Sequence, residues 1–225
     1  MWGLIGATET LTEDVTLKSH YVYVVDDDRD VRRSLSFMLG AAEIKSHPYG
    51  SGIDFLEALP DLEPGCILLD LRMPQMDGFH VMEALKERNI DWPVVVMTGH
   101  GEVPIAVRAM KMGAVDFVEK PFSEQALLAC FQQAFTLLEE RAATGKRRRE
   151  AHERAAQLTT REKEVLSALV AGQSNKQIAQ SLGISLRTVE MHRGNMMDRL
   201  GASSLAEALT LALEAGIQPA NDKAD

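Results

Sequence analysis

Carboxylates, a hydroxyl and an ammonium group follow short apolar segments that have the composition of β-strands. The first such segment is followed by Asp26, Asp27 and Asp28, the third by Asp70, the fourth by Thr98 and the fifth by Lys120. In open parallel α/β sheets the carboxyl ends of the strands are where ligands bind. We therefore expect these side chains to share one pocket.

The chemistry of such a pocket follows from its charges. Two carboxylates about 4 Å apart near a protein surface repel by about 4 kcal/mol. A Mg²⁺ ion removes that cost and suits a site with few carboxylates, so Asp26 and Asp27 are candidate metal ligands beside Asp70. Asp70 stands alone at its strand end, which makes it the candidate nucleophile toward a phosphoryl group. Lys120 would neutralise the phosphoryl oxygens and Thr98 would donate a hydrogen bond to them.

Asp28 has a simpler explanation than metal binding. It directly precedes a helical pattern that starts near Arg29. Asp is a preferred N-cap residue because its carboxylate accepts hydrogen bonds from free backbone N–H groups. We expect Asp28 to cap that helix.

Alternating strands and helices are required to position these residues. The apolar patterns predict strands at 21–25, 44–49, 66–69, 93–97 and 114–118, and helices at 30–39, 51–59, 78–88, 103–112 and 123–141. This alternation indicates an α/β domain with a five-stranded parallel sheet covered on both faces. If the strands take the flavodoxin-like order 2-1-3-4-5, the first and third strands are neighbours.

Charge divides the chain into two parts. The 225 residues carry a net charge of −9, of which 1–140 contribute −12 and 141–225 contribute +3. Such asymmetry favours two domains with different partners, and nucleic acid is the candidate partner of the basic part. The predicted organisation is a disordered leader at 1–19, a first domain at 20–141, a linker at 142–157, a second domain at 158–216 and a flexible tail at 217–225. A partly helical linker is left open.

Composition excludes a wholly disordered chain and a collagen-like chain. Hydrophobic residues make up 45% of the chain and charged residues 25%, as in ordinary globular proteins. The two cysteines, Cys66 and Cys130, lie in apolar segments and indicate buried thiols in a reducing compartment. No apolar run reaches the roughly 18 residues of a membrane span, and the N-terminus lacks a signal peptide. We expect a cytoplasmic protein that makes no membrane contact.

The second domain has the pattern of a helix-turn-helix. Helices are predicted at 160–171, 174–181, 185–200 and 203–214, with Ser174, Ser185 and Ser203 as N-caps. Leu182-Gly183-Ile184 forms the short turn between the second and third helices. In the third helix, we expect the inward face to hold Leu186, Val189, Met196 and Leu200. The rest of that helix fits the major groove of DNA. A protein-binding helix-turn-helix is the alternative.

Residues 21–140 resemble the receiver domain of two-component response regulators. The strings YVVDDD, LLDLRMPQMDG, VVVMTGHG and AVDFVEKPF carry the resemblance. It implies Asp70 as the phosphoacceptor, with Thr98, Lys120 and the aromatic Phe117 as switch residues. It also implies that Asp26, Asp27, Asp70 and the backbone carbonyl of Arg72 bind Mg²⁺.

Residues 158–214 resemble the DNA-binding domain of the LuxR class, which places the whole chain in the NarL/FixJ type and nearest to FixJ-like members. The strings LTTREKEVL and QSNKQIAQSLGISLRTVEMHRGNMMDRLGASS carry this resemblance. The resemblance implies that Glu190, Met191 and Gly194 lie nearest the bases. The candidate phosphate contacts are Lys176, Arg187, Thr188, Arg193 and Asn195, which would set affinity rather than sequence preference.

The combined resemblance implies a regulator of transcription rather than an enzyme. A partner histidine kinase would phosphorylate Asp70, and the first domain would then dimerise through a surface that includes Val107 and Lys111, bringing two DNA-binding domains onto double-stranded DNA. A Mg²⁺-dependent phosphatase is an alternative, but it needs a second Asp two residues after the nucleophile, where this chain has Arg72. A receiver that binds proteins without accepting a phosphoryl group is the other alternative.

Overall fold

The computed structural model describes residues 20–99 and 102–220. The predicted leader at 1–19 and the last part of the predicted tail, 221–225, lie outside the described residues. The chain divides into two compact units, one up to residue 141 and one from residue 142 on, and each is described here by itself.

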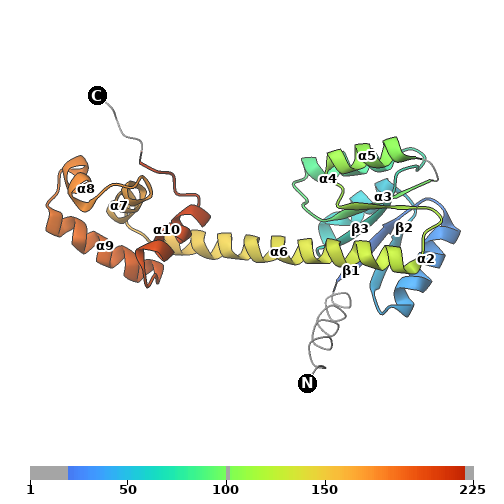
Figure 1. Ribbon diagram of the computed structural model, residues 1–225, viewed down its shortest axis with the longest axis horizontal. Coiled ribbons are helices and arrows are strands. Elements are labelled where there is room, and N and C mark those ends of the chain that lie inside the picture. Colours follow the sequence, from blue (N-terminus) through green and yellow to red (C-terminus); the bar gives the residue numbers. More distant parts are fainter. Residues whose placement is uncertain (1–19, 100–101, 221–225) are drawn as a thin grey trace, which may run out of the picture. The chain divides into compact units, whose positions relative to one another are not determined.

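The first unit is built on a five-stranded sheet (Figure 1). Its strands are β1 (Tyr21–Val25), β2 (Lys45–Tyr49), β3 (Gly65–Asp70), β4 (Val94–Thr98) and β5 (Asp116–Glu119). All neighbouring strands are parallel and their order is β2-β1-β3-β4-β5, which confirms the predicted topology.

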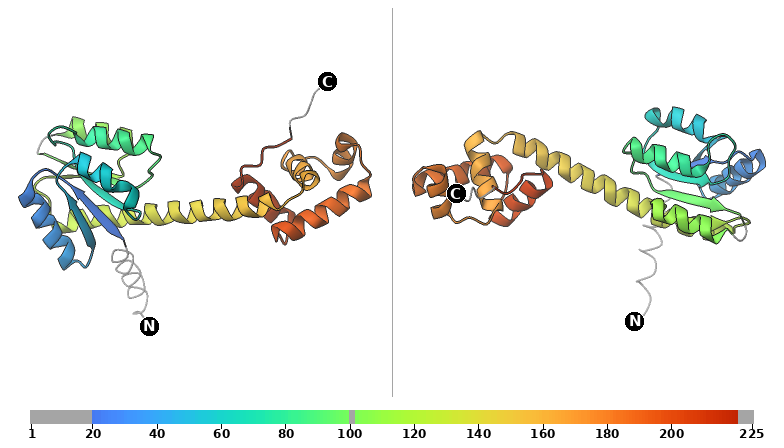
Figure 2. Two further views of the ribbon diagram at one scale, coloured as in Figure 1. Left: turned by 180° about the vertical axis from the view of Figure 1, so that it is seen from behind. Right: turned by 90° about the horizontal axis from the view of Figure 1, so that it is seen from above.

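Helices cover both faces of this sheet (Figure 2). The helices of this unit are α2 (Arg29–Ala41), α3 (Gly52–Ala58), α4 (Gly78–Glu87), α5 (Val103–Met112) and the first half of α6 (Glu124–Ala156), with a short 3₁₀ turn at Leu59–Asp61. Successive strand residues point to opposite faces. Tyr23 and Val25 therefore pack with α3, α4 and α5, whereas Val22 and Val24 pack with α2 and α6.

Asp28 is the N-cap of α2, as predicted. Its Oδ1 accepts hydrogen bonds from the backbone N–H groups of Asp30 at 2.8 Å and Val31 at 3.3 Å. Ser51 caps α3 in the same way. These caps fix where each helix begins after its strand.

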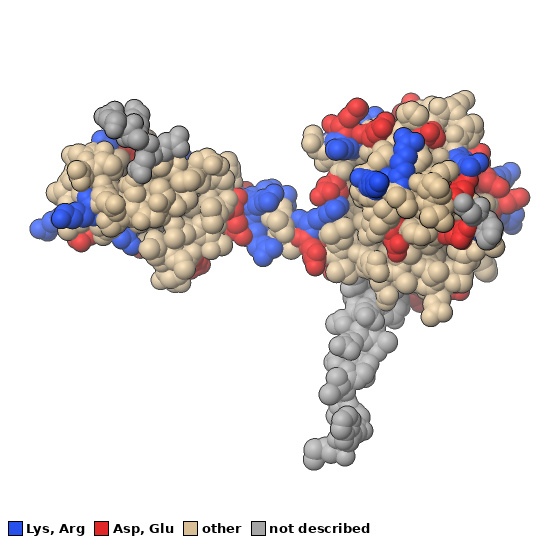
Figure 3. All heavy atoms as spheres, turned by 45° about the horizontal axis from the view of Figure 1, so that its top comes forward, with Lys and Arg blue, Asp and Glu red and all other residues tan. Residues whose placement is uncertain are grey.

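Helix α6 is much longer than the sequence pattern predicts. The pattern predicts a helix that ends at residue 141 and a linker at 142–157 that is helical at most in part, because Gly145 interrupts the pattern. Instead it continues without a break to Ala156. A glycine inside a helix costs only about 1 kcal/mol, and the alanines, lysine, arginines and glutamate around Gly145 are strong helix formers. An ion pair between Lys146 and Glu150 adds to them. Figure 3 shows Lys and Arg side chains gathered on α6 after residue 141.

The second unit contains the end of α6 and four further helices, α7 (Thr160–Val170), α8 (Asn175–Leu182), α9 (Leu186–Leu200) and α10 (Leu205–Glu214). Their apolar faces enclose a single core around Val165, Leu166 and Ile178. Ser174 and Ser185 cap α8 and α9, as predicted. The predicted cap Ser203 is wrong: Ser204 caps α10, and Ser203 instead donates hydrogen bonds to Glu207.

The first residues of the predicted flexible tail are held against α7. Ala220 N–H donates to the carbonyl of Ser167 at 3.0 Å, and the Ser167 hydroxyl donates to the carbonyl of Gln218 at 2.7 Å. Ile217 and Ala220 also pack on the core of this unit. Residues 217–220 therefore pack as part of the folded unit. Among the helices that the structure describes, none is both long and apolar enough to cross a membrane.

Candidate functional site

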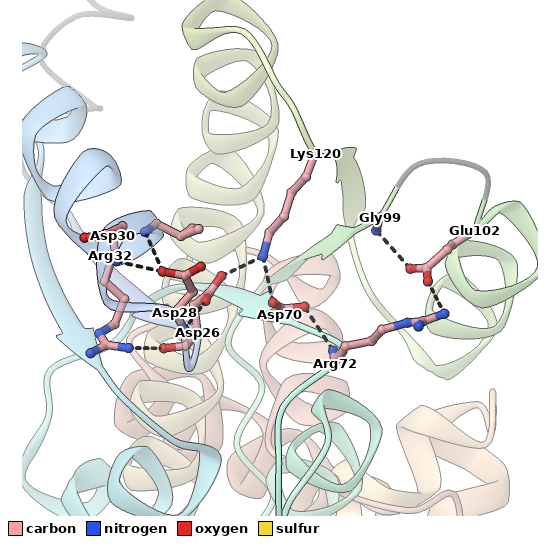
Figure 4. Close-up of polar contacts among 10 residues, drawn as sticks. Asp26, Asp28, Asp30, Arg32, Asp70, Arg72, Gly99, Glu102 and Lys120 are labelled. Carbon is pink, nitrogen blue, oxygen red and sulfur yellow. Dashed lines mark hydrogen bonds and ion pairs between the residues drawn. The ribbon is translucent and has the colours of Figure 1, made fainter.

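Three carboxylates converge at the carboxyl ends of β1 and β3. Figure 4 shows two of them, Asp26 and Asp70. Asp26 and Asp27 follow β1, and Asp70 is the last residue of β3. One carboxylate oxygen from each lies within 4.8 Å of the others. The sequence prediction that these residues meet is therefore confirmed, because β1 and β3 are neighbours in the sheet.

Asp26 is the buried member of the three. Its Oδ1 accepts the backbone N–H of Asp28 at 2.8 Å, and its own carbonyl accepts a hydrogen bond from Arg32 at 2.6 Å. Burial raises the pKa of Asp26, although hydrogen bonds from Lys120 and from the Asp28 N–H oppose this. A dication beside it would favour its ionised form.

Lys120 bridges two of the carboxylates. It follows β5, and its Nζ donates hydrogen bonds of 2.7 Å both to Asp26 Oδ2 and to Asp70 Oδ2. Burial alone would lower the pKa of Lys120, but the hydrogen bonds and negative charges of the two carboxylates outweigh it and raise that pKa. Lys120 is therefore a fixed positive charge next to Asp70.

Both oxygens of the Asp70 carboxylate have a donor. Lys120 serves Oδ2, and the backbone N–H of Arg72 donates to Oδ1 at 2.9 Å. Thr98, at the end of β4, is buried, and its carbonyl accepts the backbone N–H of Lys120 at 2.8 Å. Thr98 and Lys120 thus lie on adjacent strand ends, β4 and β5, as predicted.

The donor set fits a hard divalent cation. Carboxylate oxygens are the ligands that Mg²⁺ prefers, and a site with few of them leaves room for coordinated water. Asp27 is exposed and Asp70 is partly exposed, so the group opens to solvent. For Arg72 the structure shows the backbone N–H bound to Asp70, and its carbonyl as a metal ligand stays a prediction.

Helix α4 begins in close contact with the phosphoacceptor candidate. Gly78 N–H donates to the carbonyl of Leu71, and a Cβ atom at Gly78 would lie 2.6 Å from the carbonyl oxygen of Asp70. Only glycine fits there without displacing backbone. The first residue of α4 therefore packs directly against the backbone at the end of β3.

Sequence reasoning missed one ion pair at this site. The guanidinium of Arg72 pairs with the carboxylate of Glu102, which begins α5 and also accepts the backbone N–H of Gly99 at 2.9 Å. No sequence motif links Arg72 to Glu102, because the two residues lie on different loops, 30 positions apart in the chain.

An apolar surface lies on α5 and β5. Val103, Val107 and Met110 are exposed on α5 at helical i, i+4 and i+7 spacing, and Phe117 on β5 is 44% exposed. Lys111 is exposed as well. Val107 and Phe117 are thus accessible rather than part of the core.

The exposed face of α9 carries most of the predicted DNA contacts. Arg187, Glu190, Met191, Gly194 and Asn195 are all exposed, at spacings of three and four residues that place them on one side of the helix. The opposite side holds Val189, Met196 and Leu200, which are buried. The prediction that Leu186 packs inward is wrong: it is 48% exposed because it is the first residue of α9, directly after the turn.

The other predicted contacts have different surroundings. Lys176 is exposed on α8. The Arg193 guanidinium donates to Asn175 Oδ1, and the Thr188 hydroxyl lies 2.8 Å from that of Ser185.

The turn between α8 and α9 begins at Gly183, which ends α8 and has a left-handed φ of 64°. Glycine adopts that conformation readily.

A capping box that we did not predict fixes the start of α7. Thr159 N–H donates to Glu162 Oε2 at 2.8 Å, and the Glu162 N–H donates to the Thr159 hydroxyl. Arg199 of α9 pairs with the same carboxylate at 3.4 Å. The Thr-x-x-Glu spacing is a known signal for this arrangement.

Two protein families match the chain. Residues 22–132 match the response regulator receiver domain, and residues 156–212 match the bacterial regulatory proteins of the luxR family. Members of the first family typically bind Mg²⁺ at an acidic cluster.

Curated relatives match nearly the whole chain. The transcriptional regulatory protein FixJ of Bradyrhizobium diazoefficiens is 42% identical over 203 residues, covering 90% of this chain and 98% of the relative. FixJ of Azorhizobium caulinodans is 44% identical over 201 residues, covering 89% and 95%.

Solved structures agree with this relationship. The response regulator StyR has a TM-score of 0.73 and 40% identity, covering 86% of this chain and 98% of that structure. Full-length FixJ from B. japonicum has a TM-score of 0.55 and 42% identity, covering 88% and 98%. These relatives are transcriptional regulators rather than enzymes. The chain therefore belongs to the FixJ-like two-component response regulators, which join a receiver domain to a LuxR-type DNA-binding domain.

Proposed function

We propose that Asp70 accepts a phosphoryl group from a partner histidine kinase and that this controls dimerisation and DNA binding. The observation that carries the proposal is that the Asp70 carboxylate lies beside both Lys120 and the acidic pair Asp26 and Asp27. Charged side chains with shifted pKa values that meet at the carboxyl ends of parallel strands are typical of reactive sites.

In the transfer step, an oxygen of the Asp70 carboxylate forms a bond to phosphorus. The bond between phosphorus and the donor breaks, and the donor keeps the electron pair. Asp26, Asp27, Asp70 and the Arg72 carbonyl would hold Mg²⁺, which neutralises charge on the phosphoryl oxygens. Lys120 moves from the carboxylates to those oxygens, and the Thr98 hydroxyl donates to them.

Dimerisation would use the apolar surface of α5 and β5, including Val107 and Phe117, with Lys111 at its border. Exposed apolar residues at regular helical spacing favour contact with another protein surface. A second copy of the chain fits the regulator's need to place two DNA-binding units on DNA.

Binding to DNA would place α9 in the major groove. Glu190, Met191 and Gly194 would lie nearest the bases, while Lys176, Arg187, Thr188, Arg193 and Asn195 would contact phosphates. Their positions on or beside the exposed face of α9 support this, and Arg193 would have to leave Asn175 to reach DNA.

The test is phosphorylation with acetyl phosphate and Mg²⁺. Intact-mass spectrometry should show one added phosphoryl group on the wild type and none on Asp70→Asn. Sedimentation velocity and a genome-wide footprint with and without the donor should show a dimer and stronger DNA occupancy only for the phosphorylated wild type. Equal behaviour of wild type and Asp70→Asn would contradict the proposal.

A further inference from the structure

A continuous set of contacts joins Asp70 to the start of α5 (Figure 4). The backbone N–H of Arg72 donates to Asp70 Oδ1 at 2.9 Å, and the guanidinium of the same residue pairs with Glu102. Glu102 Oε2 accepts the N–H of Gly99 at 2.9 Å, and Gly99 directly follows Thr98. Glu102 therefore links the loop after β3 to the loop after β4.

The two side chains of this ion pair differ in how much they are exposed. The Glu102 side chain is 14% exposed, whereas that of Arg72 is 69% exposed. The carbonyl of Glu102 also accepts the N–H groups of Ile105 at 2.9 Å and Ala106 at 3.1 Å, so Glu102 forms the first turn of α5. Its carboxylate is thus tied to the helix, while the guanidinium has room to move.

A phosphoryl group on Asp70 would compete for Arg72. Such a group carries a charge of about −1.5 to −2, by analogy with other phosphoryl groups, against −1 for the Glu102 carboxylate. Arginine pairs with phosphate through two parallel N–H donors, which makes this contact stronger than a single ion pair. The backbone of Arg72 is already bound to Asp70, so the residue is anchored beside the new charge, with its guanidinium turned toward Glu102 (Figure 4).

We infer that Glu102 is a positioning residue that holds Arg72, and with it the start of α5, in the unphosphorylated arrangement. Phosphorylation of Asp70 draws the guanidinium to the phosphoryl oxygens and releases Glu102. Helix α5 carries the exposed residues Val103, Val107 and Met110. When Glu102 no longer holds the start of α5, the position of this apolar surface can change. This inference rests on the proposed role of Asp70 as phosphoacceptor.

Beryllofluoride with Mg²⁺ is a suitable probe, because an aspartate carboxylate oxygen replaces a water on beryllium and the product resembles a phosphoryl group. Glu102→Gln keeps the size of the side chain and an acceptor for Gly99 N–H, but it removes the charge that holds Arg72. We expect it to bind beryllofluoride about tenfold more tightly in a ¹⁹F NMR titration of the full chain. Arg72→Ala should bind it about tenfold more weakly.

The double variant decides the mechanism. If Glu102 acts through Arg72, Glu102→Gln has no effect on beryllofluoride affinity in the Arg72→Ala background. Glu102→Asp retains the charge and should behave nearly as the wild type. Asp91→Asn breaks the Asp91–Arg141 ion pair, which lies before β4 at the opposite sheet edge, and should change nothing.

Hydrogen exchange gives a second readout. Without the probe, amides in the first turn of α5 should exchange faster in Glu102→Gln than in the wild type, and beryllofluoride should remove that difference. An unchanged affinity in Glu102→Gln, or an equal gain with and without Arg72, overturns the inference while leaving the proposed function intact. Failure of the wild type to bind beryllofluoride would overturn the proposed function itself.

Discussion

Lys120 Nζ donates a hydrogen bond of 2.7 Å to Asp70 Oδ2, although 50 positions separate the two residues along the chain. The contact exists because Asp70 ends β3 and Lys120 follows β5, with only β4 between them. Parallel strands bring their carboxyl ends to one edge. The same ammonium also holds Asp26.

Replacement of Lys120 by Met should destabilise the first unit by about 2–3 kcal/mol at pH 7 in the presence of EDTA. The variant leaves Asp26 and Asp70 without their cation, and a buried charge that loses its partner is costly. Mg²⁺ should recover part of the loss, because a dication neutralises the same carboxylates. Urea unfolding followed by tryptophan fluorescence, to which Trp92 of the first unit contributes, measures both effects. Lys86→Met, at an exposed position on α4, should change the free energy of unfolding by less than about 0.5 kcal/mol.

Phe117→Ala should lower the stability of the first unit only slightly but weaken dimerisation strongly. Because the ring is 44% exposed, its truncation should cost about 1–2 kcal/mol, less than the 3–5 kcal/mol typical of a buried phenylalanine. Dimerisation with acetyl phosphate present should weaken at least tenfold, a loss of about 1.4 kcal/mol. Sedimentation velocity tests this. Phe37→Ala, on an 81% exposed side chain of α2, is the matched control and should dimerise normally.

Glu162 should make the stability of α7 depend on pH. Although burial alone raises its pKa, hydrogen bonds with Thr159 and the charge of Arg199 outweigh this and lower it. A group with a lowered folded pKa stabilises the fold above its unfolded pKa of about 4.3, and this stabilisation disappears as pH falls through the folded pKa. At pH 7, Glu162→Gln should therefore lower the protection of α7 amides by about 1 kcal/mol in hydrogen exchange, and the difference should shrink below about pH 4. Glu164→Gln, at a more exposed carboxylate, is the control and should change the protection of α7 amides at pH 7 by less than about 0.5 kcal/mol.

Lys176→Ala should weaken DNA binding without changing its sequence preference. Each phosphate contact releases counterions, so its loss should reduce the slope of log K against log salt concentration by about 1. Glu190→Gln should do the reverse, altering preference among sites while leaving the slope nearly unchanged. Fluorescence anisotropy over a salt series distinguishes the two. A slope for Lys176→Ala equal to that of Lys86→Ala, a control on the first unit, would show that Lys176 makes no phosphate contact.

The sheet and the acidic site were accessible to sequence reasoning because their signals are local. The strands β1, β3 and β4 are short apolar runs, and Asp26, Asp70 and Thr98 stand at or directly after their ends. The Arg72–Glu102 pair was not accessible, since it depends on how two loops approach one another. The continuation of α6 through Gly145 was missed because the cost of one glycine is smaller than the combined helix propensity of its neighbours.

The contact between Gly78 and Asp70 leaves no space for a side chain where α4 begins. A Cβ atom at Gly78 would lie 2.6 Å from the Asp70 carbonyl oxygen and 2.9 Å from Leu71 Cα, so the start of α4 fits directly against the end of β3. If Asp70 gains a phosphoryl group as proposed, we therefore expect the rearrangement on its other side, at the neighbouring strand ends of β4 and β5.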